Sequence, residues 1–276
     1  MNRITNKFNE LKEKGRIALV TYITAGDPSL ELSEEIVLKL EESGADIIEL
    51  GIPFSDPMAD GPAIQLASER ALKSGTTLKG VLETVRRIRK VSQVPIILFG
   101  YFNPFFHYGL KEFSEDAAEA GADGILVVDL PPEEDAEFKV HTDKAGLDLV
   151  FLLAPTSTTE RVELVASHAS GFIYLVSVTG VTGVRPEMNY SLDALADQIK
   201  STSGLPVGVG FGVSSVEQVE KIAEYADAVI VGSAIVKIIE QHGSNKDSLL
   251  EELSTFVNGL SGACNKPDLQ RKEKAK

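Results

Sequence analysis

The sequence lacks tryptophan, and its 276 residues include a single cysteine, Cys264. One cysteine cannot form an internal disulfide, and such a composition is typical of a reducing compartment, so we expect a cytoplasmic protein. Basic residues are also scarce, because 27 lysines and arginines stand against 41 acidic residues and leave a net charge of −14. Nucleic acids and anionic membranes are bound through basic surface, so the acidic balance argues against both as partners.

Long hydrophobic runs are absent too. The longest apolar stretches, such as residues 94–102 and 149–155, are far shorter than the roughly 20 residues needed to cross a bilayer. Residues 1–11 lack the apolar core of a signal peptide. The composition is 43% hydrophobic and 25% charged, which is typical of a folded globular protein rather than a disordered chain.

A repeated pattern organises the chain: an acidic amphipathic segment, a stop at small residues, and a short apolar run. Each copy has the form of a helix end followed by a buried strand. Further apolar runs of the same kind complete a set of eight expected strands. The pattern is clearest in ESGADIIEL (42–50), EAGADGILVVDL (119–130), KAGLDLVFLLAP (144–155) and EYADAVIVG (224–232).

Strands that alternate with helices are parallel, and eight such units in about 250 residues indicate a closed (β/α)8 barrel of the TIM type. An open doubly wound sheet is the alternative fold, although it usually has fewer strands. The interval between the second and third strands is the longest, so we expect an extra helix at residues 62–73. One domain is expected over residues 1–259, with residues 260–276 as a disordered tail. The expected strands begin near Ile17, Asp46, Pro95, Asp123, Asp148, Phe172, Pro206 and Asp227.

Glu49 is the first candidate for chemistry, because barrel enzymes carry their sites at the C-terminal ends of the strands. It ends the second strand, after Ile47 and Ile48. If Ile47 and Glu49 face the barrel interior, desolvation raises the pKa of the carboxyl and suits it to acid–base catalysis. A strand-end glutamate paired with a neighbouring cation is the other interpretation, and position alone does not separate the two.

The loop after this strand, GIPFSDPMADGP, carries two further carboxylates, Asp56 and Asp60, among prolines and glycines. A rigid loop with two acids beside a strand-end acid suggests a catalytic cluster. Aspartate is also common in turns and helix caps. Asp60 directly precedes Gly61 and Pro62, and proline is frequent at the first position of a helix, so the spacing alone favours Asp60 as a helix cap.

Glycine-containing turns follow the last three expected strands. They are SVTGVTG at 177–183, GVGFG at 208–212, and Gly232-Ser233, which opens the helical segment SAIVKIIEQ. Backbone N–H groups of such turns cradle phosphate, and barrels often place a phosphate site after strands 7 and 8. Tight turns alone would also explain the glycines. We expect a small-molecule substrate with a phosphate group.

Other residue types narrow the chemistry further. The four histidines show no paired spacing and none follows a strand, so we expect no metal site. No lysine falls at an expected strand end, which disfavours Schiff-base chemistry. Acid–base catalysis by carboxylates remains.

Five segments resemble the tryptophan synthase α-subunit family and together extend over about residues 8–240. The resemblance implies a retro-aldol cleavage of indole-3-glycerol phosphate to indole and glyceraldehyde 3-phosphate, with no cofactor in this chain. It also implies an α2β2 assembly in which indole passes to a β subunit that carries pyridoxal phosphate. The segments are LVTYITAGDPS, ADIIELGIPFSDPMADGPAIQ, VSVTGVTGVR, VGVGFGVSS and VIVGSAIV.

The resemblance implies roles for individual residues. Glu49 resembles the general acid–base group, and Asp60 resembles the carboxylate that stabilises the indole N–H as positive charge develops, which replaces its interpretation as a cap. Thr182 resembles a loop residue that contacts this aspartate on closure. The residues that match the phosphate site are Gly183, Phe211, Gly212, Gly232 and Ser233. Those that match the indole pocket are Tyr22, Phe99, Tyr101, Leu126, Leu152 and Tyr174.

A partner surface is implied at the mouth of the barrel. Exposed aromatic rings and rigid prolines suit a protein interface as well as a loop core. We expect Asp56 and the 178–184 loop to relay closure to the β subunit. The residues expected at the interface are Pro53, Asp56, Pro57 and Asn103, whereas Phe102, Phe105 and Phe106 either join it or pack beneath the third loop.

Two departures from the family pattern stand out. Tyr22 occupies a position where many members have phenylalanine, and Ser177-Val178-Thr179 replaces a common Ser-Arg-Ser. Neither touches the acid–base pair, although the second bears on loop closure. Two rival functions also fit the fold: a sugar-phosphate isomerase, which has no need of the Glu49 and Asp60 pair, and a non-catalytic allosteric subunit, against which the intact pair weighs.

Overall fold

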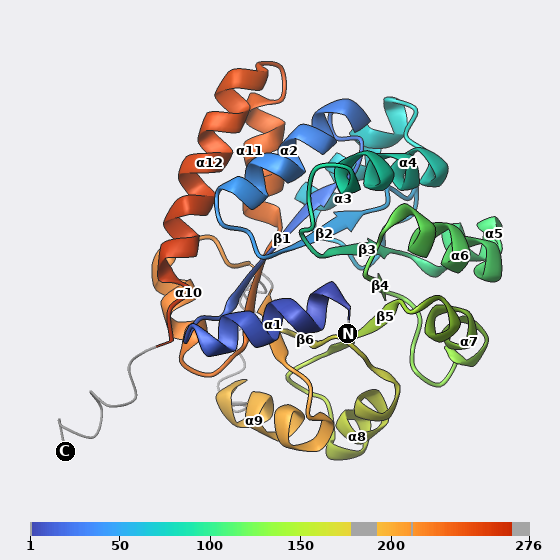
Figure 1. The fold of residues 1–276 in the computed structure, drawn as a ribbon, viewed down its shortest axis with the longest axis vertical. Coiled ribbons are helices and arrows are strands. Elements are labelled where there is room, and N and C mark those ends of the chain that lie inside the picture. The colour runs from blue at the N-terminus through green and yellow to red at the C-terminus, as the bar shows by residue number, and fades with distance from the viewer. Residues whose placement is uncertain (1, 178–191, 211, 267–276) are drawn as a thin grey trace.

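The computed structural model describes residues 2–177, 192–210 and 212–266. Within these residues, eight parallel strands pair in sequence order and close into a barrel that helices surround (Figure 1). Each strand begins within one residue of its expected start, which confirms the (β/α)8 barrel rather than the open sheet. The strands are β1 (Ala18–Thr24), β2 (Ile47–Gly51), β3 (Ile96–Gly100), β4 (Gly124–Val127), β5 (Asp148–Leu153), β6 (Ile173–Val176), β7 (Val207–Gly210) and β8 (Ala228–Val231).

Helices form the outer layer, and the expected extra helix is present as α3. Among the described helices, none combines the length and the apolarity required to span a membrane. The helices are α1 (Arg3–Glu13), α2 (Leu30–Glu42), α3 (Pro62–Lys73), α4 (Leu78–Arg89), α5 (Phe102–Tyr108), α6 (Leu110–Ala120), α7 (Ala136–Ala145), α8 (Thr159–His168), α9 (Leu192–Ser203), α10 (Val216–Ala223), α11 (Ser233–His242) and α12 (Lys246–Ala263).

Side chains alternate along each strand between two hydrophobic cores, one beneath the helices and one inside the barrel. In β2, Ile48 belongs to the cluster that packs beneath the helices, whereas Ile47 belongs to the cluster inside the barrel. Ile97 of β3 and Val20 of β1 share this interior cluster. Because side chains two residues apart on a strand lie on the same face, Glu49 faces the interior with Ile47.

Helix α1 closes the N-terminal end of the barrel. Its apolar face contributes Ile4, Phe8 and Leu11 to the interior cluster, and the ring of Phe8 lies 5.7 Å from that of Phe172, just before β6. Figure 1 shows α1 lying across this end. The strand ends that carry the candidate site therefore open at the opposite end.

The aspartates of the repeated pattern join neighbouring strands at the N-terminal end. Each stands directly before or at the start of its strand, and three of them accept a backbone N–H of the preceding strand. The acceptor–donor pairs are Asp46–Leu19 (3.0 Å), Asp123–Ile96 (2.9 Å) and Asp227–Val207 (3.2 Å). Asp123 also forms ion pairs with Arg89 at 2.8 Å and Arg3 at 3.0 Å. The aspartate of the repeat therefore helps to set the hydrogen-bond register between neighbouring strands.

The expected tail begins too early at residue 260. Helix α12 continues through Ala263, Cys264 is fully buried, and Asn265 forms an antiparallel bridge with Arg16. Leu260 and Cys264 belong to the core beneath the helices, so residues 260–266 are part of the folded domain. Residues 267–276 lie outside the described residues.

Candidate active site

Glu49 is the third of the five residues of β2, which continues through Gly51 rather than ending at Glu49 as expected, and it is in register with Tyr22 of β1 and Ile97 of β3. Its side chain is buried, and within the described residues its Oε1 atom has no hydrogen-bond partner. Burial raises the pKa of the Glu49 carboxyl to about 8. Desolvation is the cause, so the structure favours the unpaired interior carboxyl over a strand-end glutamate neutralised by a cation.

Asp60 is held in the loop that connects β2 to α3. The residue that caps α3 is Gly61, and no side chain caps the helix, so the spacing-based interpretation of Asp60 as a cap is wrong. The hydroxyl of Tyr101 donates a hydrogen bond to the Asp60 carboxyl and accepts one from the Ala59 N–H at 2.9 Å. Burial raises the pKa of Asp60 to about 6, and the Tyr101 hydrogen bond opposes this rise.

Tyr22 lies near both carboxyl groups. Its ring is buried, and its hydroxyl lies 3.2 Å from the Thr24 Oγ1 atom. Burial raises the pKa of Tyr22 above its usual range, and negative charge on Asp60 and on Glu49 adds to this effect. Both carboxyls therefore lie close enough to Tyr22 to act on it electrostatically, and the space around its ring borders both.

Apolar side chains surround this space. Phe99 meets the Tyr22 ring edge-on at 5.1 Å, and Tyr101 lies 5.3 Å from the ring of Phe54. Tyr174 is buried, and its pKa is raised by burial and then by Glu49. The residues expected in the indole pocket that belong to the barrel interior are Leu126 and Tyr174, with Phe99 and Leu152 partly buried against them. The fold thus gathers all six expected pocket residues at or below the mouth of the barrel.

The turns expected to hold phosphate follow β7 and β8. Gly232 precedes α11 and Ser233 begins it, and no side chain caps this helix. Because an α-helix leaves its first N–H groups without intrahelical acceptors, this end is suited to an anion. Gly212 has a φ of +77°, a conformation that favours glycine. Gly183 and Phe211, and also Thr182 of the expected closing loop, lie outside the described residues.

Residues 8–265 match the family description "Tryptophan synthase alpha chain". The chain belongs to this family. It is 56% identical to the tryptophan synthase alpha chain of Geobacter sp. strain M21 over 260 residues, which are 94% of this chain and 97% of the relative. It is 54% identical to that of Geobacter sulfurreducens, over 95% of this chain and 99% of the relative.

Solved structures of the family share the fold. The tryptophan synthase subunit alpha from Legionella pneumophila superposes with a TM-score of 0.88 at 42% identity, over 97% of this chain and 100% of that chain. A chain of tryptophan synthase from M. tuberculosis, in an aminoacrylate-bound form, superposes with a TM-score of 0.85 at 34% identity, over 96% and 100%. The protein is a lyase of tryptophan biosynthesis that cleaves indole-3-glycerol phosphate to indole and glyceraldehyde 3-phosphate.

The expected partner residues of this alpha chain differ in exposure. Asp56 and Asn103 are exposed and Pro57 is partly exposed, whereas Pro53 is buried.

The three rings of the β3–α6 segment also differ. Phe105 is buried and stacks on Phe113 with centroids 4.4 Å apart, so it packs beneath the loop. Phe106 is 59% exposed. Phe102 is partly buried and packs against the core.

Two glycines of the site were missed by the sequence analysis. A Cβ atom at Gly51 would collide with the ring of Tyr22, and one at Gly210 would collide with the ring of Tyr174. Gly51 lies two residues after Glu49, and Gly210 lies two residues after Gly208. The alternation of side chains along a strand could therefore have predicted that both glycines face the interior of the barrel. They leave room for the two tyrosines that border the carboxyl groups.

The described residues contain no cluster of three or more histidine, cysteine or acidic side chains that could hold a metal ion.

Proposed function

We propose that Glu49 is the general acid–base group of the cleavage and that Asp60 stabilises the positive charge that develops on the indole ring. The observation that carries this assignment is the divergence of the two environments: the pKa of buried Glu49 is raised to about 8 and that of Asp60 to about 6. At neutral pH, Glu49 is then mainly protonated and Asp60 mainly ionised. Two acids with separated pKa values are suited to complementary roles in one reaction.

Glu49 alone can supply and take back the proton that the reaction moves. Protonated Glu49 donates its proton to C3 of the indole, which places positive charge on the ring and its N–H group. The resulting carboxylate accepts the proton of the C3′ hydroxyl, a carbonyl forms at C3′, and the C3–C3′ bond breaks with its electron pair returning to the ring. Indole and glyceraldehyde 3-phosphate leave, and Glu49 is protonated again, so no external acid or base is consumed.

Asp60 acts on the charge that this sequence creates. An ionised carboxylate near the indole N–H stabilises the cationic intermediate more than the neutral substrate, and only such differential stabilisation accelerates the reaction. The Tyr101 hydroxyl fixes the orientation of Asp60 through its hydrogen bond. The apolar surroundings, to which Tyr22, Phe99 and Leu152 contribute, suit the flat indole ring.

Phosphate binding is proposed at the N-terminus of α11. Gly232 and Ser233 supply backbone N–H groups there, Gly212 approaches from the turn after β7, and Gly183 and Phe211 are proposed to complete the site. The uncapped helix end supports this proposal.

The proposed partner is a β subunit with pyridoxal phosphate in an α2β2 assembly, to which indole passes directly. Exposed Asp56, Asn103 and the neighbouring Pro57 at the mouth of the barrel support a docking surface there. Thr182 and the 178–184 loop are proposed to close over the site and to couple it allosterically to the partner. A cytoplasmic location is proposed from the single, buried cysteine.

The assignment is tested by measuring indole release from indole-3-glycerol phosphate with Glu49→Gln and Asp60→Asn. Each variant keeps the shape of the side chain, and we expect kcat to fall by about 10²- to 10⁴-fold for Glu49→Gln, the usual contribution of a positioned acid–base group. Asp60→Asn should lower kcat more than it changes KM. Glu42→Gln, at the exposed end of α2, is the control and should leave both unchanged.

A fall in kcat of less than about tenfold for Glu49→Gln would refute its role. An effect of Asp60→Asn confined to KM would indicate simple ground-state binding.

A further inference from the structure

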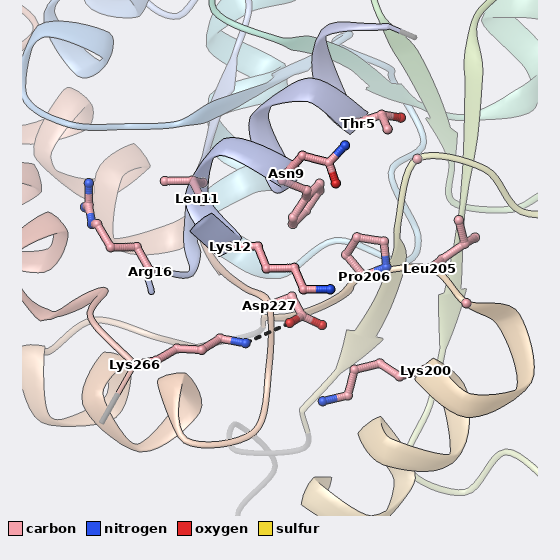
Figure 2. Close-up of a pocket in the computed structure, with 13 residues that line it drawn as sticks. Thr5, Asn9, Leu11, Lys12, Arg16, Lys200, Leu205, Pro206, Asp227 and Lys266 are labelled. Atoms are coloured by element: carbon pink, nitrogen blue, oxygen red, sulfur yellow. Dashed lines mark hydrogen bonds and ion pairs between the residues drawn. The ribbon is translucent and has the colours of Figure 1, made fainter. Parts of the chain in front are cut away.

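A cavity lies at the end of the barrel opposite to the candidate active site. It has a volume of about 390 Å³, within the range of small-molecule sites. Its walls come from α1, from α9 and the residues between α9 and β7, from the residue before β8 and from the segment after α12 (Figure 2). It shares no residue with the candidate active site, so the function proposed above does not account for it.

The charges around this cavity have the sign opposite to that of the whole protein. Four basic residues line it, namely Lys12, Arg16, Lys200 and Lys266, whereas Asp227 is its one carboxylate. The chain as a whole carries a net charge of −14. A local excess of cations on such a protein concentrates positive potential in the cavity, where low-dielectric walls strengthen it.

The carboxylate in the cavity already has partners. Asp227 accepts a hydrogen bond from the Val207 N–H through Oδ2 and forms an ion pair with Lys266 at 3.0 Å through Oδ1. Lys12 has no hydrogen-bond or ion-pair partner among the residues that the structure describes, and its ammonium group extends into the cavity (Figure 2). A cation of the cavity is thus left for a ligand.

The other two basic residues are held in place differently. Lys200 donates to the Tyr225 carbonyl at 2.8 Å and pairs with the exposed Asp197 at 3.1 Å, so its ammonium group is positioned beside the cavity with a donor to spare. Arg16 donates to the carbonyl of Ser261 at 3.1 Å, and Figure 2 shows its guanidinium directed away from the other basic groups. The three lysines are therefore the cations that face the cavity.

One wall of the cavity is apolar. Phe8 and Leu11 of α1 are buried beneath it, and Leu205 and Pro206 are partly exposed at its edge. Thr5 and Asn9 add hydrogen-bonding groups on the exposed side of α1. A pocket with an apolar wall and a cationic rim selects a ligand that has both characters.

We propose that this cavity binds a small organic anion with a dianionic group and an apolar body. The dianionic group, a phosphate ester or a pair of carboxylates, would lie among Lys12, Lys200 and Lys266, and the body would pack on Leu205 and Pro206. A bound ligand would link α1, the start of β7 and the segment at residue 266. Because the ligand binds only the folded arrangement of these segments, it stabilises the protein by mass action.

The test uses the full chain and two probes of matched shape, phenyl phosphate and phthalate, titrated by calorimetry in the presence of saturating glycerol phosphate to occupy the candidate phosphate site. We expect one further molecule of probe to bind and to raise the melting temperature. The tighter of the two probes identifies the dianion as phosphate ester or dicarboxylate.

Lys12→Gln should weaken this binding about tenfold, the loss expected for one charge-assisted hydrogen bond. It should leave indole release unchanged, which separates this site from the active site. Lys12 has no partner to lose, so the fold should tolerate the change. Lys14→Gln is the matched control, since Lys14 lies on the same segment but pairs with Glu10 outside the cavity.

Absence of binding by either probe, or equal affinity in Lys12→Gln and the parent chain, would overturn the proposal. Binding that disappears when glycerol phosphate is present, and that without glycerol phosphate is as tight in Lys12→Gln as in the parent chain, would place the probe in the active site and overturn the proposal too.

Discussion

The buried carboxyl of Glu49 should make the stability of the protein fall as the pH rises. Its pKa is about 8 in the folded protein, against an ordinary value of 4.5. Between these two values the folded state holds a proton that the unfolded state releases. The free energy of unfolding contributed by this group is therefore fully present below pH 4.5 and is lost progressively until the pH reaches about 8.

The size of this effect follows from the shift. Each unit of pH across the window costs about 1.4 kcal/mol, so the loss amounts to about 3 kcal/mol at pH 7 and about 5 kcal/mol at pH 9. A small domain has an unfolding free energy of only about 5–15 kcal/mol, so a cost of this size is measurable.

Glu49→Gln isolates the effect, because glutamine has a similar shape and does not ionise. Urea unfolding followed by circular dichroism at pH 5, 6, 7, 8 and 9 gives the unfolding free energies of both proteins. We expect their difference to change in favour of the variant by about 1.4 kcal/mol per unit between pH 5 and 8 and to level off above that. Buried amide groups without partners add a constant offset, and the contribution of Asp60 is common to both proteins, so the slope is the quantity that decides.

A difference that stays constant from pH 5 to 9 would refute the reasoning, because it would mean that Glu49 has the same pKa in the folded and unfolded states. In that case the acid–base role would lose its physical basis, whatever the activity of the variant.

Two further predictions concern the two ends of the barrel. Gly212→Asp should weaken glycerol phosphate binding by at least about tenfold in calorimetry, because it places a side chain and a negative charge beside the proposed phosphate site; unchanged affinity would move that site elsewhere. Asp123→Asn should lower the unfolding free energy by about 3 kcal/mol, because it leaves Arg89 without its charged partner at 2.8 Å, whereas the exposed Glu119→Gln should have little effect. Equal melting curves for these last two variants would show that the aspartate of the repeat contributes nothing to stability.

The architecture could be predicted from the amino-acid sequence alone, because the barrel is built from local periodicities. Apolar runs that begin near Asp46, Asp123 and Asp227 marked strands, and their alternation with amphipathic segments marked parallel pairing. The motif around Glu49 and Asp60 likewise located the candidate chemistry on one strand and the loop that follows it. These features depend on residues close together in the chain, which is why a one-dimensional pattern carries them.

The solvation of the candidate site could not be predicted from local patterns, because it depends on the closing of the barrel. Burial of Glu49, and with it the pKa of about 8, exists only once eight strands surround the carboxyl. Asp60 looked like a helix cap by spacing, yet the cap is Gly61 and the carboxyl is bound by Tyr101, a residue 41 positions away in the chain.

The C-terminal boundary of the domain and the cationic cavity also depend on contacts between distant segments. Cys264 is buried because α12 returns to the start of the barrel, where Asn265 pairs with Arg16. The cationic cavity brings Lys12, Lys200 and Lys266 together from three distant segments, and none of them has a local signature. Local spacing predicts which elements form, whereas the charge and solvation of a site depend on which distant segments the fold brings into contact.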